Sequence, residues 1–172
     1  MLSRIRTTPL VFSTILLLGI TIPTAAVPAD ITTLSLRDQF GQTDGLVQDA
    51  DGLQVAIVVS AKRLRRIKPW EQAIRRIDAD VPVIRVADVP RSPPAEYDLV
   101  AEKLRKRLPE DLPVLIDLDG IWTETFDLDT DVPNVLIFDG RGGLLARHSG
   151  MYKGDQFDAL AADLTAQSVQ SP

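Results

Sequence analysis

The amino-acid sequence predicts an α/β domain in which a mixed central sheet is flanked by helices. Short apolar, β-branched segments alternate with segments of helical period, and two strand-like segments near the end are joined by a Gly-rich turn. The length of 172 residues, with 45% apolar and 25% charged residues, is typical of one packed globular domain. Disordered and collagen-like architectures are therefore excluded.

The predicted strands are apolar segments bounded by turn residues. Residues 53–59 are almost wholly apolar, which indicates a central strand covered on both faces. The other strand candidates are residues 33–36, 83–87, 113–117, 134–138 and 144–148. Residues 38–45 read as a loop. The glycines within residues 139–143 favour a hairpin turn over a phosphate cradle, because a strand and not a helix follows them.

Three segments have the apolar spacing of helices. In residues 61–77 the apolar side chains recur every three or four residues, which places Leu64, Trp70 and Ile74 on one face. Pro69 lies inside this predicted helix, where a missing backbone hydrogen bond is expected to bend it. The other helices are expected at residues 96–108 and 153–166.

The first 26 residues have the features of a secretory signal peptide. Two arginines precede an apolar run from Leu10 to Ile22, and small residues follow it. The alternative is a retained membrane anchor. The run is shorter than the roughly 20 residues that a helix needs to cross a bilayer, which favours a cleaved signal peptide over that alternative. We therefore expect a periplasmic or secreted protein in which residues 1–26 are removed, residues 27–166 form the domain and residues 167–172 fray.

Composition excludes several kinds of chemistry. The chain has no cysteine, which excludes disulfides, thiolate metal sites, iron–sulfur clusters and thiol-based redox reactions. A single histidine, His148, excludes histidine-rich zinc or iron sites. The formal net charge of −5 gives no overall attraction for nucleic acid. We expect no cofactor, no metal, no nucleic-acid partner and no catalytic residue.

Three local features, in their order and spacing, resemble the thioredoxin fold in the redoxin-type variant of exported proteins, of the AhpC/TSA or TlpA type. They are a strand at 55–59 leading into a helix that contains Pro69, the dipeptide Val132-Pro133 directly before the strand at 134–138, and Asp139-Gly140 followed by Gly150. The resemblance spans residues 34–164. It implies a three-layer fold with helices on both faces of a mixed sheet.

The resemblance also implies where the family carries its chemistry. Its active dithiol lies at the start of the first helix, and counting back from Pro69 places those positions at Ala61 and Leu64. Because both thiols are missing, the chain cannot carry out thiol–disulfide exchange alone. The family has a cis peptide bond at the position of Val132-Pro133. A cis bond would expose the Val132 backbone as an edge for an extended peptide; the alternative is a tight turn that seats the hairpin.

Basic residues crowd the start of the first predicted helix. They are Lys62, Arg63, Arg65, Arg66 and Lys68. Exposed cations at a helix N-terminus oppose the helix dipole by roughly 0.3–1 kcal/mol each, so helix stability does not favour them there. An anionic partner would offset this cost through guanidinium contacts with a carboxylate or phosphate. The alternative is a solvated face balanced by Glu71, Asp78 and Asp80.

The remaining candidates favour structural roles. Acidic residues gather at Asp117, Asp119, Glu124, Asp127, Asp129 and Asp131. The last three would share one side of an extended segment, but a calcium loop fails at Val132 and Phe138, so turn-forming aspartates are expected. His148 is expected at the surface end of a strand, with Ser149 on the opposite face, so the two do not form a catalytic pair. Trp70 and Trp122 are expected to pack in the core.

The sequence thus predicts an exported, non-catalytic, thioredoxin-like module for binding or assembly. Its expected site is a groove between the basic helix start, with Lys62, Arg63, Arg65 and Arg66, and the Val132-Pro133 edge. The expected partner is another exported protein or an anionic peptide or ligand, with no stable membrane span after signal cleavage. The alternatives are a redoxin-related accessory that acts with a cysteine-bearing partner, and a structural envelope protein.

Overall fold

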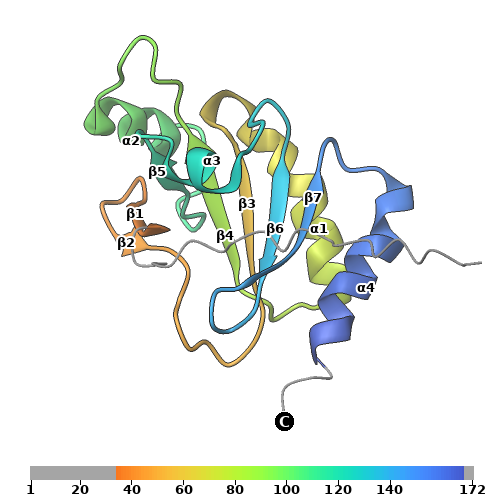
Figure 1. Cartoon of the computed structure of the whole chain (residues 1–172). Coiled ribbons are helices and arrows are strands. Elements are labelled where there is room, and N and C mark those ends of the chain that lie inside the picture. The colour runs from red at the N-terminus through yellow and green to blue at the C-terminus, as the bar shows by residue number, and fades with distance from the viewer. Residues whose placement is uncertain (1–33, 169–172) are drawn as a thin grey trace, which may run out of the picture.

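A computed structural model describes residues 34–168 of the chain, where a five-stranded sheet has the order β5-β4-β3-β6-β7 (Figure 1). Its strands are β3 (Gln54–Ser60), β4 (Val83–Asp88), β5 (Leu115–Asp117), β6 (Asn134–Phe138) and β7 (Leu144–Ser149). β3, β4 and β5 are parallel to one another, β6 is antiparallel to β3, and β7 is antiparallel to β6, so the sheet is mixed as predicted. The predicted signal peptide lies outside the described residues.

Helices and a small ladder complete three layers. The helices are α1 (Ile67–Ile77), α2 (Tyr97–Arg105), α3 (Ile121–Phe126) and α4 (Phe157–Ser168). α1, α2 and α4 cover one face of the sheet, and α3 covers the other face together with the ladder β1 (Leu36–Arg37) and β2 (Thr43–Asp44). Between residues 34 and 168 no helix is both long and apolar enough to cross a membrane.

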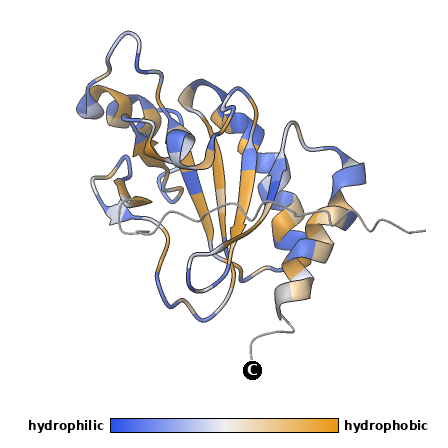
Figure 2. Ribbon diagram, viewed as in Figure 1, coloured by the Kyte–Doolittle hydropathy of each residue, from blue (hydrophilic) through white to orange (hydrophobic). Residues whose placement is uncertain are grey.

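Strand β3 is the centre of the core because both of its faces are covered. All seven of its residues are buried. Val55, Ile57 and Val59 contact the α1 and α4 side, whereas Ala56 and Val58 contact the α3 side. Figure 2 shows the resulting apolar band along the central strands. The nearly continuous apolar run in the sequence reflects this double burial.

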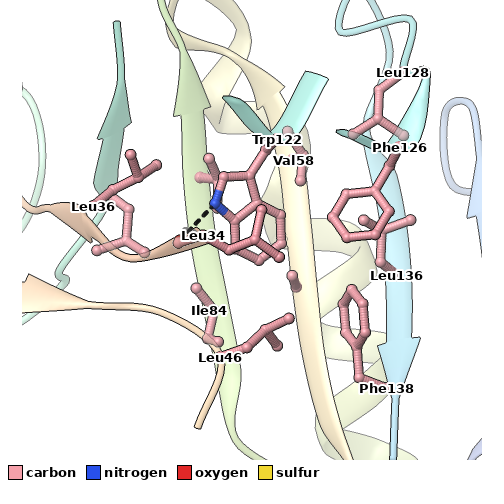
Figure 3. Close-up of a cluster of buried hydrophobic side chains, with 13 residues drawn as sticks. Leu34, Leu36, Leu46, Val58, Ile84, Trp122, Phe126, Leu128, Leu136 and Phe138 are labelled. Carbon is pink, nitrogen blue, oxygen red and sulfur yellow. Dashed lines mark hydrogen bonds between the residues drawn. The ribbon is translucent and has the colours of Figure 1, made fainter. Parts of the chain in front are cut away.

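The two tryptophans anchor opposite faces of the sheet, and both are fully buried as predicted. Trp122 of α3 lies in the cluster of Figure 3, where its indole N–H donates to the Leu34 carbonyl oxygen at 2.9 Å. Trp70 of α1 packs on the other face and donates to the Gly150 carbonyl oxygen at 3.0 Å. Each ring thereby buries a large apolar area while its polar N–H remains bonded.

The first predicted helix divides into two parts. Residues Ala61–Arg66 form a 3₁₀ helix, η2, and the α-helix α1 begins only at Ile67. Pro69 therefore lies in the first turn of α1, where a backbone N–H has no intrahelical acceptor to lose. The prediction of one long helix bent in its middle by this proline was wrong.

The segment between β5 and β6 also differs from expectation. It contains the short helix α3, which the sequence did not predict and which ends where Asp127 adopts a left-handed conformation with φ of 49°. The Asp131 N–H donates to Asp129 Oδ1 at 2.9 Å, which forms a turn. The three aspartates do not line an extended strand, and Asp129 forms a turn as expected. β2 lies in the predicted loop, and α4 continues to Ser168, past its predicted end.

Candidate functional site

The 3₁₀ geometry of η2 sorts its six residues into three columns. This helix has three residues per turn, so side chains at i and i+3 eclipse one another. Ala61 and Leu64 form an apolar column, Lys62 and Arg65 an exposed column, and the third contains Arg63 and Arg66. Each column has its own environment.

The apolar column occupies the positions implied for the missing dithiol. Ala61 and Leu64 are half-buried and pack against a cluster built on α2 and β5, which includes Leu104 and Ile116. Leu64 also contacts the cluster beneath α1. Apolar side chains that pack against the core thus occupy the positions at which the resemblance places the dithiol.

The third column is held by Asp131. Arg63 lies 3.1 Å from the Asp131 carboxylate, and Arg66 donates to the Asp131 carbonyl oxygen at 2.8 Å. The structure therefore brings the basic helix start and the segment before Pro133 together, as predicted, but two arginine side chains span the space between them. Asp131 was missed as a partner because its contact with Arg63 crosses 68 residues of sequence.

The exposed column has no acidic partner among the described residues. Lys62 and Arg65 are exposed, and within residues 34–168 neither forms an ion pair. Two of the three acids proposed to balance this region have partners elsewhere. Glu71 pairs with Arg85, and Asp78 accepts the backbone N–H groups of the turn after α1.

The peptide bond between Val132 and Pro133 is trans, so the cis bond implied by the resemblance is wrong. The cis peptide bond within residues 34–168 is Ser92–Pro93. The Val132 carbonyl oxygen accepts the Asn134 amide at 3.0 Å, and the Pro133 carbonyl oxygen accepts the Gly150 N–H at 3.0 Å. These bonds fix the segment to its neighbours, as expected of a turn that positions the hairpin. A cis bond was the condition for an exposed Val132 edge, and that condition is not met.

The acidic residues serve local structure. Asp117 is fully buried, and its two carboxylate oxygens accept the N–H groups of Ile121 and Trp122, each at 2.9 Å. Burial raises the pKa of Asp117, and the nearby Asp88 adds to the effect while the backbone N–H groups oppose it. Glu124 pairs with Arg91. No group of metal-ligating side chains is present in the described part of the chain.

His148 is not the surface residue that was expected. Its side chain is 12% exposed, its ring centroid lies 6.0 Å from that of Trp70, and its Nε2 lies 2.9 Å from Asp163 Oδ2 without hydrogen-bond alignment. Ser149 donates to Asn134 instead. The two neighbours thus have separate partners, as the alternation of side chains along a strand predicts.

An open cavity of about 670 Å³ lies beside the outer face of α1, next to η2. Lys68, Gln72 and Arg76 line it from the helix, and Tyr152 lines it from the loop after β7. Of these residues the sequence drew attention to Lys68 alone, because only the fold brings the loop after β7 against α1.

Comparisons with solved structures give the same architecture. A pneumococcal exposed lipoprotein thioredoxin, Etrx1 of Streptococcus pneumoniae, matches with a TM-score of 0.59 and 18% identity over 76% of this chain and 98% of that one. The N-terminal domain of PilB from Neisseria gonorrhoeae matches with a TM-score of 0.57 and 16% identity over 82% and 97%. A putative thiol:disulfide interchange protein DsbE from Chlorobium tepidum matches with a TM-score of 0.52 and 16% identity over 77% and 90%.

No protein-family model matches the sequence. No curated protein matches it either. The likeness to these structures therefore lies in the path of the backbone, because the sequences are only 16 to 18% identical. The chain has the thioredoxin-like fold of the redoxins, and it lacks the cysteines of their active site.

Proposed function

We propose that this protein is a non-catalytic binding module that captures an anionic partner on the exposed cations of η2. The observation that carries the proposal is the Lys62–Arg65 column, which is exposed and has no acidic partner within residues 34–168. Two eclipsed like charges repel each other, and a bound carboxylate or phosphate relieves that repulsion. The adjacent column held by Asp131 keeps the segment in place.

The apolar residues at the two positions implied for the dithiol support a role without redox chemistry. Thiol–disulfide exchange needs a thiolate, and Ala61 and Leu64 supply apolar packing at the two positions. Purified protein should therefore show no sustained insulin reduction or peroxide consumption. Turnover without an added partner would contradict the proposal.

We place the protein in the periplasm or outside the cell, with another exported protein or an anionic peptide as its partner. The signal-peptide pattern of residues 1–26 supports this, and the similar structures include an exposed lipoprotein. Cell fractionation of the full chain tests it. Recovery of the protein in the cytoplasmic fraction would contradict an exported role.

The binding site is tested by reversing the charge of the exposed column. Lys62→Glu with Arg65→Glu should abolish most crosslinked capture of the partner from a periplasmic extract. Arg66 is left unchanged because its contact with Asp131 ties the helix start to the following segment.

Lys103→Glu with Arg107→Glu is the matched control. It makes the same charge change at exposed positions on and after α2, remote in sequence from η2. The control should capture the partner as well as the unmodified protein. Equal loss in both double variants would show that net charge alone governs capture, and unchanged capture in both would remove η2 as the site.

A further inference from the structure

Lys68, Arg75 and Arg76 line the cavity beside α1, and within residues 34–168 none of them forms an ion pair with an acidic residue. Among its lining residues, Glu71 is paired with Arg85 of β4, at side-chain exposures of 20% and 12%. Lys68 is exposed and has no ion pair within the described range. Arg76 contacts the Tyr152 hydroxyl at 3.3 Å and the Phe157 ring at 4.9 Å, neither of which carries charge at neutral pH. The cavity therefore favours an anionic occupant.

The cations are spaced along one face of the helix. Lys68, Gln72 and Arg76 follow one another at four-residue intervals, and all three are exposed. At a rise of about 1.5 Å per residue, the two cations stand about 12 Å apart along the axis. An extended chain rises about 3.3 Å per residue, so acidic side chains roughly four residues apart would reach both. Gln72 lies between them and offers an amide to a peptide backbone.

An apolar surface adjoins these charges. Pro69 is exposed, and Tyr152 packs edge-on against Trp70 with 5.1 Å between the ring centroids. Gly150 precedes Tyr152 in the loop after β7, and its backbone bonds to Trp70 and Pro133. The cavity thus combines cations with an apolar floor formed by Pro69 and Tyr152.

We propose that this face binds an extended acidic peptide segment of another protein, with an apolar side chain of the peptide against Pro69 and Tyr152. The inference rests on the proposed function, because it names the partner chemistry of the basic region that begins at η2. A cavity of this size accommodates one such side chain together with part of its backbone. The apolar floor and the negative charge of the whole protein favour a short peptide over a long nucleic acid.

The test is a titration of the full protein with a blocked peptide that carries two glutamates four residues apart and a phenylalanine midway between them, so that the extended peptide presents all three side chains on one face. Two further peptides replace glutamate by glutamine or phenylalanine by serine. Binding should weaken at least about fivefold with either change, and it should weaken as salt concentration rises. Lys68→Glu should weaken binding by about fivefold or more, whereas Lys103→Glu on α2 should leave it unchanged.

The variants separate this inference from the proposed function. If Lys68→Glu weakens binding and Lys62→Glu with Arg65→Glu does not, the cavity is the site and η2 is not. If only the η2 double variant weakens it, the cavity proposal fails and the η2 site stands. Equal affinity for the serine peptide would overturn the apolar floor, and tighter binding of a single-stranded oligonucleotide would overturn the choice of a peptide.

Discussion

Two helical segments begin just after parallel strands of the sheet, and the charged side chains at their first turns are of opposite sign. α3 follows β5, and the carboxylate of Asp117 accepts the backbone N–H groups of Ile121 and Trp122. η2 follows β3 and has neither a side-chain cap nor an acidic residue in its first turn. Its exposed positions carry Lys62 and Arg65 instead.

The difference separates a structural helix start from one available to a partner. At α3 the carboxylate of Asp117 is part of the chain itself and is fully buried. It accepts the backbone N–H of Trp122, whose side chain lies in the core. At η2 the described residues supply one acid, Asp131, to one of three columns. Lys62 and Arg65 have no acidic partner among the described residues, and a binding partner can supply the missing negative charge.

The largest expected effect is the loss of the built-in anion. Asp117→Ala removes the acceptor of two N–H groups and should lower the free energy of unfolding by about 2 to 3 kcal/mol. Urea unfolding followed by tryptophan fluorescence measures it. Asp119→Ala changes an exposed carboxylate two residues away and should stay within about 0.5 kcal/mol. Equal effects from both variants would contradict the capping role.

A smaller loss is expected from the apolar column of η2. Leu64→Ala removes half-buried packing against two core clusters and should cost about 1 to 2 kcal/mol. Lys62→Ala, in the exposed column, should change stability by less than about 0.5 kcal/mol. If the two variants were equally stable in urea, the sorting of η2 into columns would be wrong.

Asp117 also makes the free energy of unfolding depend on pH. Because burial raises its pKa above the unfolded value of about 4, its contribution to stability is complete below that value. The contribution is lost as pH rises through the folded pKa. Asp117→Asn cannot ionise, so the unfolding free energy of the native protein should fall relative to this variant as pH rises from acid toward neutral. A constant difference across that range would contradict a raised pKa.

The smallest expected effect comes from removing the one acid that η2 has. Asp131→Asn frees the Arg63 side chain and should change stability by less than about 1 kcal/mol, since the Asp131 side chain is 74% exposed. Affinity for the acidic peptide should rise about two- to fivefold, because one more cation becomes available. Weaker binding in this variant would mean that Asp131 positions the site rather than competing for it.

The sequence predicted the sheet better than the site. The apolar run of β3 and the hairpin β6–β7 are local patterns, so their strands lie close to where they were expected. The 3₁₀ form of η2 and the α3 helix were missed, because six-residue segments carry too little periodicity to distinguish one helix type from another or from a turn. The basic residues were visible in the sequence, whereas the role of Asp131 and the position of Tyr152 depend on contacts between distant segments.

The most direct test of the account is a map of where an acidic peptide touches the protein. Backbone amide shifts of the isotopically labelled protein should change in η2, in α1 up to Arg76 and in the loop from Gly150 to Tyr152. Those of α3 should not change, because its anion is already built in by Asp117. Shifts concentrated at α3, with η2 and α1 unaffected, would contradict the account.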